Sequence, residues 1–193
     1  MSKKQFQIFV EGKADKKFLE DYLTHIKDEL SIDILEIKAI GGKDKLEKIL
    51  PIFELNNPNV TNIVIFDTDT LRSQNMNEIK KKISSLNFEI PVFLIPNDED
   101  SGNLETLLEK IINKENSELF ICWNNYIECL ESKKKGYTTP NQKAKIFAYL
   151  EALLDIKESE KTEFEKRDYT NPNHWDLDSS YLNPLKTFLT NLK

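Results

Sequence analysis

Acidic side chains follow two of the apolar runs in this sequence. Residues 5–10 lead into Glu11, and residues 62–66 lead into Asp67 and, two positions later, Asp69. Side chains two positions apart in an extended backbone project to the same side, so Asp67 and Asp69 can share one cation. Two carboxylates this close would otherwise repel each other and raise a pKa, and a divalent cation relieves that repulsion. The pattern therefore predicts a site for a divalent metal ion.

Two further candidates lie beside this pattern. Gly12 directly follows Glu11, where the backbone must turn sharply after the predicted strand. Glu105 would lie in the first turn of a helix capped by Asn103. An acid in that turn also stabilises the helix through its dipole, so the sequence leaves open whether Glu105 belongs to the site.

These residues need a scaffold, and the first half of the chain has the pattern of a parallel sheet covered by helices. Strands are expected at residues 5–10, 34–40, 62–66 and 92–95, with helical spacing of apolar residues between them. The run at 62–66 is apolar throughout its centre, which is typical of a central strand buried on both faces. Ligands of such sheets bind at the carboxyl ends of the strands, which is where the acids lie.

The second half of the chain shows only helical spacing of apolar residues. We expect an α/β domain over residues 1–115 and a helical extension over residues 116–193, packed together as a single compact unit. The charged, turn-rich residues 157–173 favour an exposed connection over a binding arm. Residues 174–178 (HWDLD) are expected to dock the last helix on the sheet, and closure of the metal site from above is the alternative.

Composition limits the possible functions. The chain has 193 residues, and 27 Lys and Arg against 33 Asp and Glu give a net charge of −6. This charge argues against nonspecific coating of DNA, but a nucleic-acid enzyme can carry its positive charge as bound cations. No apolar run approaches the roughly 20 residues of a membrane-spanning helix, and the polar start lacks the apolar stretch of a signal peptide, so we expect a cytoplasmic protein. Cys122 and Cys129, seven positions apart, would share one helical face and are interpreted as core thiols.

The two acidic motifs together resemble the Toprim domain of topoisomerases, primases and nucleases of the overcoming-lysogenization-defect family. Residues 9–12 (FVEG) stand for the glutamate motif of that domain, and residues 65–69 (IFDTD) for its DxD motif. Residues 41–43 (GGK) lie where many members have a glycine-containing turn after the second strand. The resemblance covers roughly residues 5–112. It implies an α/β fold with an open, mainly parallel four-stranded sheet flanked by helices, and the C-terminal helices would form a cap.

Two further stretches resemble a small, largely uncharacterised bacterial family of Toprim-like proteins related to those nucleases. They are residues 93–108 and the ending at residues 175–189, so this similarity spans nearly the whole chain. The first motif departs from the nuclease branch, in which a further acid commonly follows the glycine by a residue or two. Asp15 either substitutes for that acid or only begins the helix, and the second interpretation is favoured.

The resemblance implies a site for Mg²⁺ or Mn²⁺. Asp67 and Asp69 would bind the metal, and Glu11 would bind it or act as a general acid or base. Glu105 is the candidate ligand for a second metal ion. By this resemblance Glu11, Asp67 and Asp69 are also the catalytic residues.

The reaction implied by the resemblance is phosphoryl transfer on nucleic acid, and nuclease-type hydrolysis of phosphodiester bonds is its simplest form. Gly12 and Lys43 lie near the predicted strand ends and are the candidate substrate-binding residues. No base-reading element is identifiable, so both DNA and RNA stay open as the nucleic-acid partner. The sequence leaves a homo-oligomer open, the resemblance suggests a partner from a defence system, and no membrane partner is expected.

Two other functions fit part of the pattern. A noncatalytic assembly module could keep the acids only as a metal or nucleotide site, which suits the small size and the net negative charge. Small-molecule phosphatases of the haloacid-dehalogenase type also carry a DxD motif at a strand end. That motif normally follows the first strand and has a glycine after the second aspartate, whereas here it follows the third predicted strand and precedes Thr70.

Overall fold

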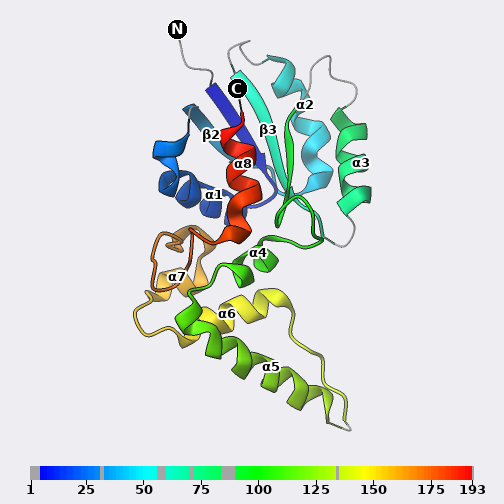
Figure 1. Cartoon of the computed structure of the whole chain (residues 1–193). Coiled ribbons are helices and arrows are strands. Elements are labelled where there is room, and N and C mark those ends of the chain that lie inside the picture. The colour runs from blue at the N-terminus through cyan, green and yellow to red at the C-terminus, as the bar shows by residue number, and fades with distance from the viewer. Residues whose placement is uncertain are drawn as a thin grey trace.

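Four strands form an open sheet in the computed structural model of the chain (Figure 1). The structure describes residues 5–30, 33–55, 60–69, 72–83, 90–133 and 135–192. The strands are β1 (Gln5–Val10), β2 (Asp33–Ala39), β3 (Val60–Asp67) and β4 (Val92–Ile95), in the order β2-β1-β3-β4. All three pairings are parallel, which confirms the predicted α/β fold class.

The two central strands, β1 and β3, are apolar enough to be covered on both sides. Val10 of β1 pairs with Ile65 of β3, and Asp67 at the end of β3 pairs with Ile95 of β4. This register places Glu11, the residue after β1, beside the last residues of β3. The two predicted acidic motifs therefore meet at one edge of the sheet.

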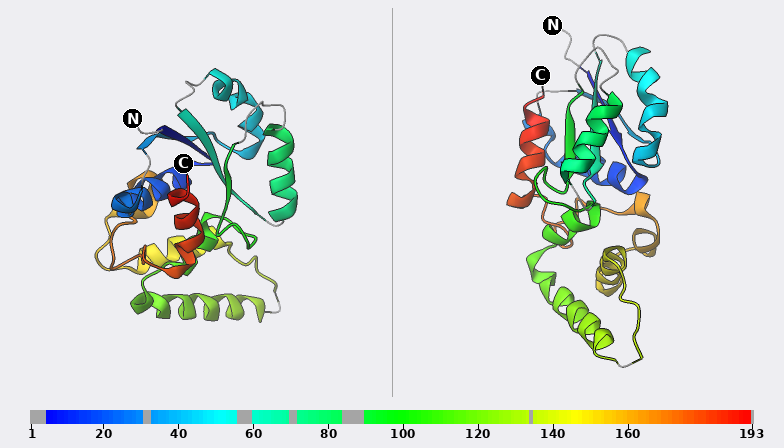
Figure 2. Two further views of the ribbon diagram at one scale, coloured as in Figure 1. Left: turned by 45° about the horizontal axis from the view of Figure 1, so that its top comes forward. Right: turned by 90° about the vertical axis from the view of Figure 1, so that its right-hand side faces the viewer.

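Helices cover both faces of the sheet (Figures 1 and 2). The helices α1 (Lys13–His25) and α8 (Asn183–Thr190) pack on one face, and α2 (Leu46–Leu55) and α3 (Arg72–Ile83) pack on the other. Side chains alternate across a strand, so residues 63 and 65 of β3 belong to the first core and residues 64 and 66 to the second. In the sequence, Ile79, Ile83 and Leu86 have the spacing of one helix, and Leu86 lies outside the described residues.

The remaining helices lie beyond the carboxyl ends of the strands. They are α4 (Leu104–Lys110), α5 (Ser117–Glu131), α6 (Gln142–Ala152) and α7 (Glu158–Thr162). Short 3-10 helices cover Lys27–Glu29, Lys43–Lys45, Lys114–Asn116, Phe164–Lys166 and Ser180–Leu182. The helices α5 and α6 form a hairpin that projects away from the sheet (Figure 1).

The end of the chain returns to the sheet. Trp175 is buried, with its ring 5.4 Å from the ring of Tyr149 and 5.3 Å from that of Tyr169. In α8, the ring of Phe188 lies 5.3 Å from that of Phe93 in β4. Residues 174–178 thus dock the last helix, as the first of the two interpretations predicted.

One prediction about burial is wrong, and another holds for most but not all of its residues. Cys122 and Cys129 are exposed and are not part of the core, because α5 has no fully buried residue along its length. Residues 157–173 are less exposed than predicted, since Arg167 and Tyr169 are buried. The Arg167 guanidinium packs over the ring of Phe164, at 4.6 Å from its centre, which lets a charged side chain enter the interior.

Within the described part of the chain, no helix is both long enough and apolar enough to cross a membrane.

Candidate functional site

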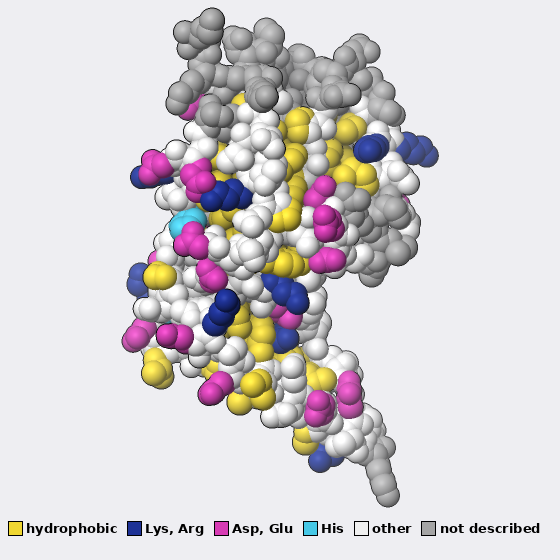
Figure 3. Space-filling model, viewed as in Figure 1, with side chains coloured by type: hydrophobic (Ala, Val, Ile, Leu, Met, Phe, Trp, Pro, Cys, Tyr) yellow, Lys and Arg dark blue, Asp and Glu magenta, His cyan; other side chains and the backbone are white. Residues whose placement is uncertain are grey.

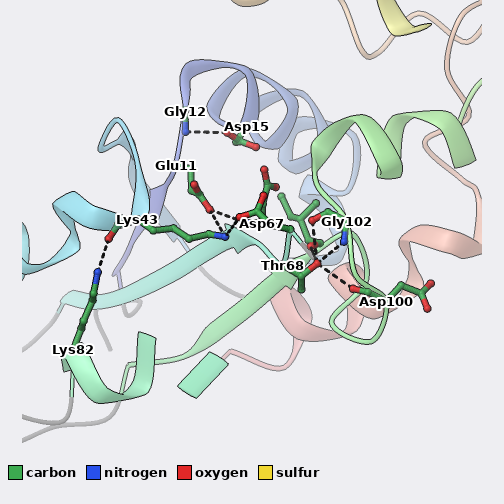
Figure 4. Close-up of polar contacts among 11 residues, drawn as sticks. Glu11, Gly12, Asp15, Lys43, Asp67, Thr68, Lys82, Asp100 and Gly102 are labelled. Carbon is green, nitrogen blue, oxygen red and sulfur yellow. Dashed lines mark hydrogen bonds and ion pairs between the residues drawn. The ribbon is translucent and has the colours of Figure 1, made fainter. Parts of the chain in front are cut away.

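The ends of β1 and β3 are tied together by the side chain of Glu11 (Figure 4). Its Oε1 accepts a hydrogen bond from the backbone N–H of Asp67 at 3.0 Å. The carbonyl oxygen of Glu11 accepts from the N–H groups of Gly41 and Gly42, at 2.7 and 3.2 Å. Both glycines have positive φ values, 80° and 122°, which other residues rarely adopt. The glycine turn thereby brings the chain after β2 to the same edge of the sheet.

Lys43 follows this turn, and its side chain reaches into the group of acids. The ammonium nitrogen lies 2.5 Å from Oδ2 of Asp69 and 3.3 Å from Oε1 of Glu11. The carbonyl oxygen of Lys43 accepts a hydrogen bond from Nζ of Lys82 in α3 at 3.2 Å. Burial lowers the pKa of Lys43, but the hydrogen bonds and charges of Asp69 and Glu11 outweigh it and raise that pKa overall. A full positive charge therefore lies between two of the predicted metal ligands.

Thr68, between the two aspartates, fixes the path of the chain after β3. Its hydroxyl lies within 3.1 Å of the carbonyl oxygens of Ile95, Asp100 and Gly102, and it accepts the N–H of Gly102 at 2.6 Å. The N–H of Asp69 donates to the same Gly102 carbonyl at 2.7 Å. This network holds the DxD motif against the turn that leads into α4.

Asp15 joins the site from the first turn of α1. Its Oδ2 accepts the N–H of Gly12 at 2.9 Å, and the side chain is buried. Burial is the main cause that raises the pKa of Asp15 to about 6, and the charge of Glu105 adds to it. Because Asp15 also raises the pKa of Asp67, it lies close enough to act on the central acid. Asp15 thus begins the helix, as the favoured interpretation predicts, and its charge also acts on Asp67.

Gly12 has a local role in this arrangement. A Cβ atom at this position would lie 3.0 Å from Oδ2 of Asp15, which is tighter than an ordinary contact. The absence of a side chain lets the chain turn from β1 into α1 while Asp15 stays close.

Asp67 is the centre of the acidic group. Burial is the main cause that raises its pKa to about 9. The other causes are the negative charges of Asp15, Glu11, Asp69 and Glu105. Burial likewise raises the pKa of Glu11, against the opposing effect of Lys43. At neutral pH and without a cation, Asp67 therefore holds its proton.

Glu105 lies in the first turn of α4. Asn103 caps that helix by accepting the N–H of Thr106 at 3.0 Å, so both the capping signal and the helix are as predicted. The charge of Glu105 raises the pKa of both Asp15 and Asp67.

The carboxylates suit a divalent cation of the magnesium type. Carboxylate oxygens are the ligands that Mg²⁺ and Mn²⁺ prefer. Oδ1 of Asp67 is buried and has no hydrogen-bond partner among the described residues, so it is free to accept a cation. In the same described ranges, no three His, Cys, Asp or Glu side chains already converge as a ready metal-binding group. The Lys43 ammonium supplies the positive charge that a cation would otherwise bring.

The structure brings together the predicted residues Glu11, Asp67, Asp69 and Lys43, and sets Gly12 and Glu105 beside them. Sequence reasoning missed Thr68. Asp15 lies three residues after Gly12, where its side chain accepts the N–H of that glycine at the start of the helix, as predicted. Of the other acids near β4, Asp98 and Asp100 are used in the turn itself: Asp98 accepts the N–H of Leu94 and Asp100 accepts from the amide of Asn97.

The fold was compared with solved structures. The C-terminal region of the OLD protein of Xanthomonas campestris pv. campestris matches with 13% sequence identity and a TM-score of 0.47, over 96% of this chain and 94% of that one. A second structure of that region has 12% identity and a TM-score of 0.39, over 96% and 92% of the two chains. The C-terminal region of the Burkholderia pseudomallei OLD protein has 14% identity and a TM-score of 0.37, over 98% and 90%. A search of curated proteins finds no match.

A comparison with protein families gives a match along nearly the whole chain, which is the extent that the resemblance predicted. Residues 5–193 match the family described as "Protein of unknown function (DUF3226)", and the chain belongs to that family.

Proposed function

We propose that this protein is a divalent-metal-dependent enzyme that hydrolyses phosphodiester bonds of nucleic acid at the carboxyl ends of β1 and β3. The observation that carries the proposal is Asp67. Its carboxylate lies at the end of a central strand, with a buried oxygen that lacks a partner and with other acids around it. The charged form of such a carboxylate is unfavourable in the folded protein unless a cation binds to it. Carboxylates with raised pKa values are typical of active sites, including those that depend on a metal ion.

The acids around Asp67 come from several elements. Glu11 and Asp69 contact Lys43, and the charges of Asp15 in α1 and Glu105 in α4 act on Asp67. In our proposal Asp67 would hold a cation together with Glu11 and Asp69, and Asp15 and Glu105 would help to hold a second one. Mg²⁺ or Mn²⁺ bound there would neutralise charge on a phosphate and lower the pKa of a bound water.

The side chains of the chain itself have separate tasks in this proposal. Glu11 is held in one orientation by the N–H of Asp67. Its pKa is raised by burial, so it can exchange a proton with water or a leaving group nearer to neutral pH than an ordinary glutamate. Lys43, once a cation takes over its contacts, becomes free to contact a phosphate oxygen of the substrate.

The experiment that tests the proposal is cleavage of labelled single- and double-stranded DNA and RNA by the full chain with Mg²⁺ or Mn²⁺. We expect cleavage of at least one polymer. The double variant Asp67→Ala, Asp69→Ala should lose it by at least a hundredfold, because the shared ligand is gone. The variant Asp28→Ala, which removes an exposed acid far from the site in the sequence, is the matched control and should keep full activity.

Equal cleavage by the parent and the double variant would contradict the proposal, because the activity would then not depend on these acids. No cleavage of any polymer, in protein that manganese nevertheless stabilises, would support the noncatalytic metal-binding module instead. DNA and RNA are distinguished by the same panel.

A further inference from the structure

The hairpin of α5 and α6 has an apolar surface that the other described residues leave exposed. Tyr126 on α5 is 49% exposed, Cys122 and Cys129 of the same helix are exposed, and α5 has no fully buried residue. Figure 3 shows hydrophobic side chains at the surface of this projecting part of the molecule. A helix of 15 residues with this many exposed apolar groups is unusual for a surface that meets only water.

A groove runs along this surface between the two helices. It has a volume of about 360 Å³ and is mainly apolar. Cys122 and Tyr126 of α5 form one side, and Ala148 and Ala152 of α6 form the other. The two alanines are one helical turn apart and share a face, so their small side chains allow another helix to approach closely.

The residues of α5 beside the groove have the spacing of a helix-packing seam. The helix already uses a different stripe, made of partly buried residues, to pack on α6. The seam consists of Cys122, Tyr126 and Cys129, which are separated by four and three positions. Leu119, one turn earlier, is partly buried and packs against the core of the molecule. The other stripe of α5 consists of the partly buried residues Phe120, Trp123, Ile127 and Leu130, and the ring of Phe120 contacts that of Tyr149 in α6. Intervals of three and four place side chains along one helix face, so α5 can pack on two helices at once.

Charges at the two ends of the seam select its partner. Glu115 and Glu118 are exposed at its beginning, and Lys133 and Lys135 are exposed after its end. A second copy of the chain in antiparallel orientation would set the acidic end of one α5 against the basic end of the other. A parallel copy would set like charges against each other, which is unfavourable. The acids Glu128 and Glu131 point away from the seam, since each is displaced from Cys129 by about 100° or more around the helix.

We propose that this surface is the contact between two copies of the chain, with the α5 helices antiparallel. The contact is isologous, which means that both copies use the same surface. The acidic end of each α5 therefore faces the basic end of the other, and this pairing occurs twice in the dimer. An α5 of 15 residues is about 22 Å long, and its footprint alone is smaller than the roughly 800 Å² per partner of a stable dimer. The partner's hairpin therefore also covers the α6 side of the groove, and the two hairpins form a four-helix arrangement. This inference does not depend on the metal site.

The first test is the mass of the full chain in solution by light scattering or sedimentation. We expect twice the 22.5 kDa of one chain. Tyr126→Glu should raise the dissociation constant at least tenfold, because it places a charge in the seam. Ile121→Glu is the matched control, since Ile121 is an exposed apolar residue of the same helix on a different side, and it should leave the dimer intact. A monomer at all concentrations up to about 100 μM would overturn the proposal, as would equal effects of the two variants.

The second test is a charge exchange, which distinguishes the orientations. Glu118→Lys and Lys133→Glu should each weaken the dimer by about threefold to tenfold, and the double variant should restore it. In a parallel dimer, each single variant keeps like charges facing one another and changes little. Absence of rescue in the double variant would therefore overturn the antiparallel contact.

Discussion

Two properties of Asp67 destabilise its charged form. The carboxylate oxygen Oδ1 is buried, and the negative charges of four other acids act on the side chain. A carboxylate in such a position holds its proton until a cation arrives, because the charged form is destabilised by lost hydration and by repulsion. Lys43 offsets part of this repulsion through Glu11 and Asp69. The same few side chains therefore determine both the stability of the fold and the binding of a metal ion. Single substitutions can separate the contributions of these side chains.

The pH dependence of stability should change when Asp67 is replaced by Asn. Its pKa is about 9 in the folded protein against an ordinary 3.8, so between these values folding takes up a proton and stability falls as pH rises. The slope for one proton is at most about 1.4 kcal/mol per pH unit. Without divalent metal, Asp67→Asn should melt at a higher temperature than the parent at pH 8, and the difference should narrow toward pH 5.

Thermal melts from pH 5 to pH 9 measure this effect, and Asp28→Asn is the control that should follow the parent. The raised pKa of Asp15 also makes the stability fall as the pH rises from its ordinary pKa of 3.8 to about 6. The parent and Asp67→Asn both contain Asp15, so this contribution is the same in the two proteins. An Asp67→Asn protein less stable than the parent at pH 8 would show that the carboxylate is not destabilising.

Replacement of Lys43 by Met should make manganese bind more tightly. The ammonium nitrogen contacts Glu11 and Asp69, so a cation that uses these oxygens must displace it. We expect the Mn²⁺ concentration for half-maximal thermal stabilisation to fall by roughly tenfold, which corresponds to about 1.4 kcal/mol. Lys48→Met, at an exposed lysine of α2, should not change it. Weaker manganese binding in Lys43→Met would mean that the lysine is not displaced.

The positions of Glu11, Asp67 and Asp69 were predictable because each follows an apolar run, and parallel strands end at one edge. Asp15 was harder to interpret, since an acid at the start of a helix has a sufficient local explanation in the helix dipole. Its burial depends on segments far away in the sequence, and Tyr169 near the end of the chain is among the groups that its charge affects. No local pattern contains that information.

Above the single residues, the turn after β4 and the end of β3 form one hydrogen-bonded unit. Thr68 connects the two, because its buried hydroxyl meets backbone groups of Ile95, Asp100 and Gly102. The strands themselves were predictable from their apolar runs, and the cap of α4 from Asn103. The hydrogen bonds of Thr68 to the turn after β4 were not predictable, because a threonine between two aspartates has no distinctive sequence signal.

Thr68→Val should destabilise the protein although it keeps the shape of the side chain. The substitution removes the acceptor of the Gly102 N–H and leaves that partly buried group unpaired, so we expect a loss of about 1–3 kcal/mol. Denaturant unfolding measures the change. Thr61→Val, at a partly buried threonine near the start of β3, should cost less than 1 kcal/mol. Equal losses at the two positions would contradict the role of the Thr68 hydroxyl.

The molecule as a whole is completed by its last helix. Leu182, Leu185 and Leu189 belong to the same core as β1 and β3, although more than a hundred residues separate them from these strands. The boundary predicted near residue 115 followed a change in pattern from alternating elements to helices. A sequence pattern shows where periodicity changes, but it does not show that α8 packs back onto the sheet. The exposure of Cys122 and Cys129 has the same origin, because among the described residues of α5 it is Leu119 and Phe120, at its beginning, that pack against that core.

A fragment of residues 1–115 should not fold by itself. It lacks the three leucines and Trp175, so the part of the sheet face that α8 covers would be exposed to water. Circular dichroism and thermal melting of the fragment, beside the full chain, test this. A cooperative transition in the fragment would contradict it and would indicate two independently folding parts.

The central claim is that carboxylates at the ends of β1 and β3 bind a divalent cation, and titration calorimetry with Mn²⁺ tests it most directly. The full chain at pH 8 should bind at least one Mn²⁺ ion, and Asp67→Asn should lose this binding while remaining folded. Absence of binding at millimolar Mn²⁺ in the parent, or equal binding by the variant, would contradict the account.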